Sequence, residues 1–416
     1  IQIGYLLLVF TLLLISMIYL YKFRYAVFED DNNITFIFLN ISLSVIMSLI
    51  LADINPRLIY VAPICIFPLL TKTFFDSRIA FFVHIVSVLI ISFTVLNGFE
   101  YIFIQILAGI ISILSTSQIY KRANLFISVA QITLMYFLGY IVFYLLSSGN
   151  IEKVDFFQFG YFLSNGMLTL FVLPLIYFYE KIFSLVSDVS LLELSDTNSP
   201  LLKDLSDKAP GTFHHSLQVA NLSEACANEI NANALLTRVG ALYHDIGKIK
   251  KPNFFSENQK GSISPHDELS PEESAKIIID HVSDGISLGK KNKLPDRILD
   301  FIRTHHGTSK VYFFYKKQIE LYPNSDIKKF VYQGPKPFSK ETSIVMMADS
   351  IEAASKSLKE PSFEILEEFV HKIINQQMDE GQFINTNITF SKIEAVKKVL
   401  IRKLVNIYQL RIEYPN

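Results

Sequence analysis

The sequence predicts an all-α protein in which a polytopic helical membrane domain precedes an all-helical soluble domain. Half of the 416 residues are hydrophobic and only 19% are charged, which is too apolar for a chain that is soluble throughout. Long apolar runs fill residues 1 to about 185, whereas most Lys, Glu and Asp residues follow residue 190. From residue 212 to about 410 the spacing of apolar residues is helical, and no alternating strand pattern stands out.

Windows of about 20 apolar residues predict seven membrane-spanning helices. The third of them is the weakest, because it is short and contains Pro63 and Pro68. An alternative with one span fewer makes this segment re-entrant. The predicted spans cover residues 2–21, 34–52, 57–72, 79–97, 100–120, 124–147 and 160–186.

Basic residues near the ends of spans collect on the cytoplasmic side, so their distribution predicts the topology. With seven spans and a cytoplasmic C-terminal half, the outside loops hold only Arg57 and Lys153. Residue 1 is then external. Because the chain begins with Ile1 and not Met, we expect it to continue upstream. The inside loops hold Lys22, Arg24, Lys72, Arg78, Lys121 and Arg122.

Residues 187–210 predict a polar helical connector, interrupted at Ser199 and Pro200, that leads into a soluble domain over residues 211–416. The two cysteines cannot build a disulfide framework, which suits a reducing compartment for the soluble part. A formal net charge of −1 gives no reason to expect a nucleic-acid polymer as partner.

Histidines are concentrated in one part of the predicted soluble domain. Neutral imidazoles together with carboxylates are typical metal ligands, and this density is hard to explain by packing alone. Two other histidines, His84 in a predicted span and His371 in a late helix, are interpreted as structural. The clustered histidines are His214, His215, His244, His266, His281, His305 and His306.

Several short motifs around these histidines occur in a fixed order: GTFHHSLQVANLSEAC, ALYHDIGKIKKPNFF, SPHDELSP, IIIDHVSDG, RTHHGTSKVYFFY, GPKPFSKE and MMADSIEAA. As a set they resemble the HD-domain metal-dependent phosphohydrolases, and more narrowly the bacterial seven-transmembrane HD proteins that hydrolyse cyclic di-AMP. The resemblance implies a multi-pass protein of the bacterial plasma membrane with a cytoplasmic HD domain. It also implies an extracellular sensor domain upstream with its own ligand, and it leaves a homodimer open.

The resemblance further implies two divalent transition-metal ions, for which imidazole and carboxylate donors favour iron or manganese over zinc. Asp245 would bridge the two ions. Of His214 and His215, which point about 100° apart on a helix, the family pattern selects His215 as a ligand. His214 is left to second-layer contacts or to packing. One ion would be held by His215, His244, Asp245 and Asp349, and the other by Asp245, His281, His305 and His306.

Substrate contacts are predicted at Lys248, His266, Gly307 and Thr308. Lys248 could meet a phosphate oxygen, with a solvated surface lysine as the alternative. His266 could protonate the leaving 3′-oxygen, with a loop-structuring role as the alternative. The aromatic run at residues 311–317 could stack on adenine, but aromatic residues at helical spacing are more often core.

The function that these features predict is a membrane-anchored phosphodiesterase, with Asp245, Lys248 and His266 in catalytic roles. It would open cyclic di-AMP to pApA through a dinuclear metal centre and a bridging hydroxide. The alternatives are an HD hydrolase for another nucleotide and a receptor that binds a nucleotide without turnover. Cyclic di-GMP is less favoured, because the branch specialised for it carries Gly-Tyr-Pro after His-His-Gly, and here Thr-Ser-Lys follows.

Overall fold

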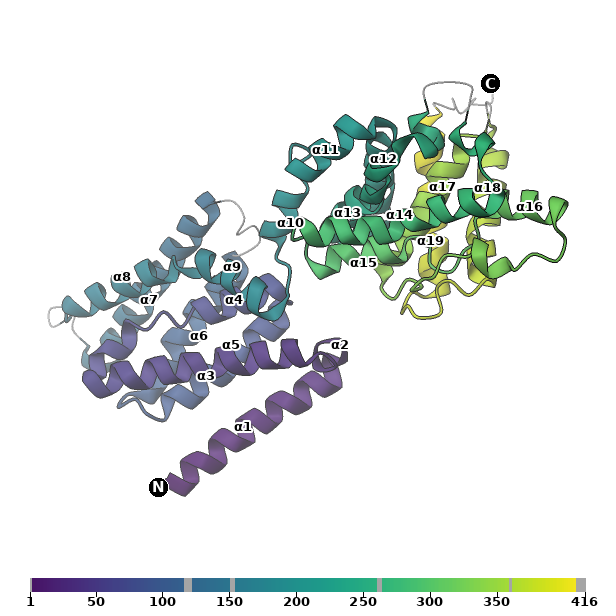
Figure 1. Cartoon of the computed structure of the whole chain (residues 1–416). Coiled ribbons are helices and arrows are strands. Elements are labelled where there is room, and N and C mark those ends of the chain that lie inside the picture. Colours follow the sequence, from purple (N-terminus) through teal and green to yellow (C-terminus); the bar gives the residue numbers. More distant parts are fainter. Residues whose placement is uncertain (1, 116–121, 150–153, 260–263, 359–360, 409–416) are drawn as a thin grey trace, which may run out of the picture. The chain divides into compact units, whose positions relative to one another are not determined.

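The computed structural model describes residues 2–115, 122–149, 154–259, 264–358 and 361–408. These residues form helices joined by turns, with one isolated β-bridge between Lys310 and Val331 and no longer strand among them. The all-α prediction is therefore confirmed. The chain divides into two compact units, Ile1–Val189 and Ser190–Asn416. Figure 1 shows the helices of both units along the sequence.

Four helices of the first unit are long and apolar enough to cross a membrane, and the bent pair α8 and α9 would make a fifth span. Exposed apolar side chains cover α1, where Ile3, Leu6 and Phe10 are at least 63% exposed, as expected for a surface that faces lipid. The helices of this unit are α1 (Gln2–Phe23), α2 (Tyr25–Phe28), α3 (Asp31–Ile54), η1 (Pro56–Tyr60), α4 (Ile66–Phe74), α5 (Ser77–Ser92), α6 (Gly98–Ser115), α7 (Arg122–Ser148), α8 (Phe157–Thr169) and α9 (Val172–Phe183).

The predicted third span, residues 57–72, is not a continuous helix. It consists of η1 and α4, with an irregular stretch between them that contains Pro63. The Asn165 amide donates to the backbone oxygens of Tyr60 at 3.1 Å and Ala62 at 2.5 Å, which supplies hydrogen bonds that the break removes from the helix. The count of seven spans stays a prediction. Two residues that were used to orient the spans, Lys121 and Lys153, lie outside the described residues.

The second unit begins with α10 (Asp188–Leu194) and α11 (Pro200–Lys208), within the predicted connector. Pro200 is the first residue of α11, where its missing N–H costs nothing, and Ser199 precedes it as the N-cap. The rest comprises α12 (Pro210–Glu229), α13 (Ala234–Tyr243), η3 (Ile246–Lys250), η4 (Pro252–Phe254), η5 (Ser256–Asn258), η6 (Pro265–Glu268), α14 (Pro271–Lys291), α15 (Asp296–Thr304), α16 (Tyr312–Leu321), η7 (Ile327–Phe330), α17 (Lys340–Ser355), α18 (Phe363–Asp379) and α19 (Phe390–Ile407).

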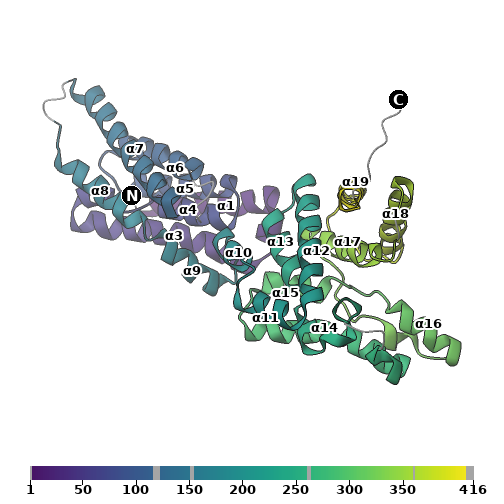
Figure 2. The ribbon, with the colours of Figure 1, turned by 90° about the horizontal axis from the view of Figure 1, so that it is seen from above.

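Helices α12, α13, α15 and α17 pack together and form the core of this unit, as Figure 2 shows from above. The aromatic run at residues 311–317 lies on α16 and only partly joins the core. Phe314 is buried, whereas Tyr312 and Phe313 are 67% and 63% exposed. The expectation that this run is core is therefore wrong for its first two rings.

Candidate metal centre

Seven side chains predicted as metal ligands converge from five elements of the second unit. His215 comes from α12, His244 and Asp245 follow the end of α13, His281 lies on α14, His305 and His306 follow α15, and Asp349 lies on α17. All are buried except His306, whose side chain is 24% exposed. Three overlapping groups have ligand atoms within 4.8 Å of one another: His215, His244 and Asp349; His244, Asp245 and His305; and His281, His305 and His306.

Two local features bring these residues together. At Gly247 a Cβ atom would lie 1.8 Å from the backbone oxygen of His281, so only glycine lets η3 lie this close to α14. At the other end of the site α15 stops at Thr304, and Gly307 adopts a φ of +50°. This left-handed turn ends the helix there. His305 and His306 therefore both reach the cluster.

The Asp245 carboxylate lies between two sets of imidazoles. Its Oδ2 is 3.6 Å from His215 Nε2 and 3.3 Å from His244 Nε2. Its Oδ1 is 3.2 Å from His281 Nε2 and 3.6 Å from His305 Nε2. One oxygen therefore faces each half of the cluster, which is the arrangement that a bridging carboxylate needs.

The imidazoles are fixed in orientation by their outer nitrogen atoms. His244 Nδ1 donates to the Ala241 carbonyl at 2.6 Å, and His305 Nδ1 donates to the Ile302 carbonyl at 2.9 Å. His281 Nδ1 donates to a backbone carbonyl in the same way, three residues earlier in its helix. Because a carbonyl can only accept, the proton is on Nδ1 in the neutral ring, and the Nε2 lone pair points into the cluster.

Glu352 orients His215 and was missed by the sequence analysis. Its carboxylate accepts from His215 Nδ1, while His215 Nε2 lies 2.9 Å from Asp349 Oδ1. Asp349 and Glu352 are three residues apart on α17 and so share a helix face. This spacing of three residues could have indicated that Glu352 lies near the predicted ligand Asp349.

The donor set fits metal ions. Within the described residues, His244 Nε2 and Asp245 Oδ1 are buried without a hydrogen-bond partner. Buried polar atoms without partners are costly, and a cation among them would remove that cost. The buried cysteines Cys65 and Cys226 are elsewhere in the sequence, and the three ligand groups contain only nitrogen and oxygen donors. Such donors suit borderline divalent ions such as iron or manganese.

The two halves of the cluster differ in charge. Burial opposes protonation of His244, but Asp245 and Asp349 outweigh it and raise the pKa of His244 to about 10. Burial opposes ionisation of Asp245, yet Lys248 and His244 hold its pKa well below the usual range. In the other half, burial and then His305 and His281 lower the pKa of His306 well below its usual value. His306 is therefore neutral near pH 7, the form that binds metal.

Lys248 lies inside this site. Its Nζ is 2.7 Å from Asp245 Oδ2 and 2.9 Å from Glu257 Oε1, and it lies 4.9 Å from the centroid of the Phe255 ring. The side chain is only 13% exposed, so the alternative of a solvated surface lysine is wrong. A contact between Lys248 and a phosphate stays a prediction.

His266 has other neighbours. Its Nε2 is 2.8 Å from the Phe254 carbonyl, and its ring packs against Phe254 and Phe314. These contacts match its loop-structuring alternative. Its proposed part in proton transfer stays untested.

The predicted substrate contacts Gly307 and Thr308 directly follow the ligand His306 in the chain. Gly307 and His306 border a cavity of ≈ 220 Å³ that Arg303, Tyr332 and Asp280 also line. The His306 ring stacks on Tyr332 at a centroid distance of 4.2 Å. The N–H and the hydroxyl of Thr308 both donate to the Gln382 side-chain oxygen. The sequence analysis also missed Gln382.

The fold and the His-Asp cluster define a chain with a helical membrane unit and an HD-type metal-binding unit. Residues 1–187 match the family described as 7TM receptor with intracellular HD hydrolase, and residues 212–354 match the HD domain. The chain belongs to this seven-transmembrane HD family.

The cyclic-di-AMP phosphodiesterase PgpH of Listeria monocytogenes is 37% identical over 366 residues, which cover 86% of this chain and 50% of that protein. PgpH of Bacillus subtilis is 36% identical over 365 residues, which cover 86% of this chain and 51% of that protein. The chain thus spans about half the length of these relatives. The solved structure of the L. monocytogenes PgpH HD domain in complex with cyclic-di-AMP is 46% identical, has a TM-score of 0.50, and covers 51% of this chain and 100% of that chain.

Proposed function

We propose that the chain is a membrane-anchored, metal-dependent phosphodiesterase that hydrolyses cyclic di-AMP to linear pApA. The observation that carries this proposal is the Asp245 carboxylate, whose two oxygens face two separate sets of imidazole Nε2 atoms. The similarity to the PgpH phosphodiesterases supports the choice of nucleotide. In this proposal residues 1–186 anchor the enzyme, residues 187–210 connect, and residues 211–416 form a cytoplasmic HD domain.

One ion would be held by His215, His244, Asp245 and Asp349, and a second by Asp245, His281, His305 and His306. Bound divalent ions supply Lewis acidity toward the phosphoryl group and lower the pKa of coordinated water. His306 is 24% exposed and borders the cavity beside Tyr332, which supports an approach of the substrate from that side.

Lys248 would bind and orient the substrate phosphate. Its ammonium is already at the cluster and is held there by Asp245 and Glu257, so it would need little reorganisation to contact a phosphate oxygen. Burial opposes its charge, but the two carboxylates outweigh this and raise the pKa of Lys248 above its usual value, which keeps it cationic at neutral pH.

Product analysis tests the proposal. Residues 187–416 contain the whole of the second compact unit, Ser190–Asn416, together with the first residues of α10. The corresponding PgpH HD domain has been solved as a separate chain, so this piece can be studied alone. It should be assayed with manganese or iron on cyclic di-AMP, cyclic di-GMP and simple nucleotides. We expect pApA from cyclic di-AMP. Nucleotide binding without product would favour a receptor, and turnover of another nucleotide alone would favour a different HD hydrolase.

A further inference from the structure

The loop between α18 and α19, residues 380–389, has one face toward the metal centre and another toward an apolar pocket. Helix α18 ends in a left-handed turn at Gly381, whose φ is +65°. The Gly381 N–H donates to the Met378 carbonyl at 2.9 Å and the Gln382 N–H donates to the Gln377 carbonyl at 3.0 Å. This pair of bonds is the Schellman arrangement, and it fixes the direction of the chain after the helix.

On the side of the loop that faces the metal centre lies Gln382, which is 1% exposed. Its Oε1 accepts from the Thr308 N–H at 3.1 Å and from the Thr308 hydroxyl at 3.3 Å. A Cβ atom on Gly307 would lie only 2.4 Å from the same oxygen. The loop is therefore in direct contact with the turn that follows His305 and His306.

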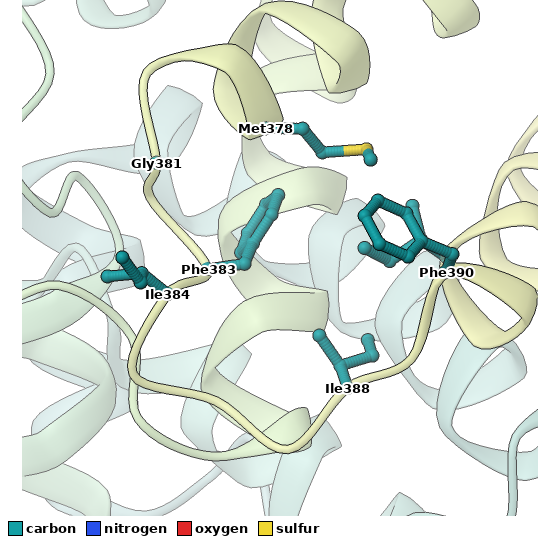
Figure 3. Close-up of a pocket in the computed structure, with 7 residues that line it drawn as sticks. Met378, Gly381, Phe383, Ile384, Ile388 and Phe390 are labelled. Carbon is teal, nitrogen blue, oxygen red and sulfur yellow. The ribbon is translucent and has the colours of Figure 1, made fainter.

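The outward face of the loop borders a cavity of ≈ 330 Å³. Figure 3 shows Met378, Phe383, Ile388 and Phe390 facing a common space. The volume is within the range of about 300–1,000 Å³ that ligand pockets occupy, and an apolar cavity of about 150 Å³ already holds benzene. The walls are formed by Met378, Gly381, Phe383, Ile384, Ile388, Phe390 and Ile393.

Two of the lining side chains lie at an exposed rim. Ile384 is 76% exposed and Phe390 is 77% exposed, whereas Phe383 and Ile393 in the wall are below 9%. Clustered exposure of large apolar side chains around a hollow is typical of a site that an apolar ligand covers. An aliphatic chain would remove both rim residues from water.

A cation lies beside the wall of this pocket. The Lys336 ammonium donates to the backbone oxygen of Gly381 at 2.9 Å, and a Cβ atom on Gly381 would lie 3.6 Å from it. Within the described residues, no carboxylate is within ion-pair distance of Lys336. Lys336 is not itself a wall residue, but its ammonium lies against the backbone of Gly381, which is, and no described carboxylate neutralises its charge.

We propose that this pocket binds a fatty-acid-like amphiphile, with the aliphatic chain against Phe383 and Phe390 and the carboxylate near Lys336. Occupancy would move or rigidify the 380–384 turn and act through Gln382 on the turn that carries His305 and His306. Binding is independent of the proposed phosphodiesterase activity, whereas its regulatory consequence rests on that activity. The two are tested by different measurements.

Binding is tested with dodecanoate and residues 187–416 in detergent-free buffer by isothermal titration. We expect saturable one-to-one binding, and binding of dodecanol weaker by up to about fivefold, because an exposed ion pair contributes that much. Phosphatidylglycerol vesicles distinguish free acid from membrane acyl chains by cosedimentation. Adsorption to vesicles without binding of free dodecanoate would overturn the assignment of a free acid.

Pocket variants show whether dodecanoate binds at this site. Met378→Trp should fill the cavity and Phe390→Ser should remove the exposed rim, and each should weaken binding at least about tenfold, since burial of one large apolar side chain is worth about 1.5–3 kcal/mol. Phe390 is 77% exposed, so its replacement should leave the fold intact. The control is Phe363→Ser, an exposed ring on the same helix as Met378 but outside the pocket. Unchanged binding in Phe390→Ser would place the ligand elsewhere.

Coupling is tested through manganese affinity, which needs no turnover. Saturating dodecanoate should change the manganese dissociation constant by about fivefold or more, the lower end of typical allosteric effects. In Gln382→Ala, dodecanoate should still bind while this change disappears. An equal change in parent and Gln382→Ala would refute the route through Gln382, and no change in the parent would refute coupling altogether.

Discussion

Removal of the Glu352 carboxylate should weaken metal binding without unfolding the domain. Glu352 accepts from His215 Nδ1 and so fixes the ring with Nε2 toward Asp349, 2.9 Å away. Loss of such an outer partner of a metal-binding histidine typically costs 10- to 100-fold in metal affinity, or about 1.4–2.7 kcal/mol. We expect about 10-fold for Glu352→Gln, which keeps an acceptor oxygen, and closer to 100-fold for Glu352→Ala.

The larger effect of alanine follows from the burial of His215, which is 4% exposed. Without an acceptor, its Nδ1–H would be left buried and unpaired, and the ring could turn to find another partner. The assay is competition for manganese against a chromophoric chelator at pH 7.5, with circular dichroism to verify the helical fold.

Lys356 provides the matched control. Its ammonium lies 3.0 Å from Glu352 Oε2 but is 51% exposed, so this ion pair should contribute little. Lys356→Gln should therefore change manganese affinity by less than about threefold. If Glu352→Ala also stays within that range while remaining folded, Glu352 does not position the ligand and the assignment of His215 to the metal centre loses its support.

Five further outcomes are expected. Asp245→Ala should abolish turnover and lower metal content with the helical fold retained; full activity in a metal-replete variant would exclude a bridging role. The pKa of His244 is raised, so a metal ion must displace its proton. Manganese binding at pH 7 should therefore release at least about one proton, and the affinity for manganese should rise with pH. Calorimetry in buffers of different ionisation enthalpy would measure the released protons. The same imidazolium stabilises the metal-free fold below about pH 6.5, and this contribution is lost as pH rises toward 10. Cysteines introduced at Asn32 and Gly149 should differ in labelling by an impermeant thiol reagent in intact cells, whereas equal labelling would refute the predicted topology. Replacement of Asp196–Ser199 by a Gly-Ser stretch should preserve hydrolysis by the HD domain but remove any response of the longer protein to an upstream ligand; a normal response would make residues 187–210 a passive tether.

The density of histidines indicated a metal site, because metal-binding chemistry restricts residue type, whereas the particular ligand set was implied by the resemblance to the HD family. Imidazole and carboxylate pairs such as His244 and Asp245 are visible as adjacent letters in the sequence. The residues behind them were not predicted. Glu352 shares a helix face with Asp349, so its position could have been inferred from the three-residue spacing. Gln382 contacts Thr308 across 74 residues, and no local sequence pattern indicates such a contact.

The membrane unit was harder to predict for a different reason. A hydropathy window measures apolar content, which is high across residues 57–72, but it does not detect a break in the helical hydrogen bonds. That break depends on Asn165, more than 100 residues later, whose amide donates to the carbonyls of Tyr60 and Ala62. Pro63 and Pro68 marked this span as the weakest, but the sequence did not show that Asn165, a distant side chain, satisfies carbonyls that the break leaves free.

The unequal charge of the two halves of the metal centre suggests an order of metal loading. His281, His305 and His306 share one half, where burial and mutual repulsion keep the pKa of His305 and His306 below the usual value, so neutral ligands are present at pH 7. In the other half the pKa of His215 and His244 is raised, and a metal there must first displace protons. Asp245 belongs to both halves, and a cation bound by the first half would partly neutralise its negative charge. The charge of Asp245 favours the proton on His244, so an ion held by the first half would lower the cost of deprotonating His244 and would favour binding of a second ion.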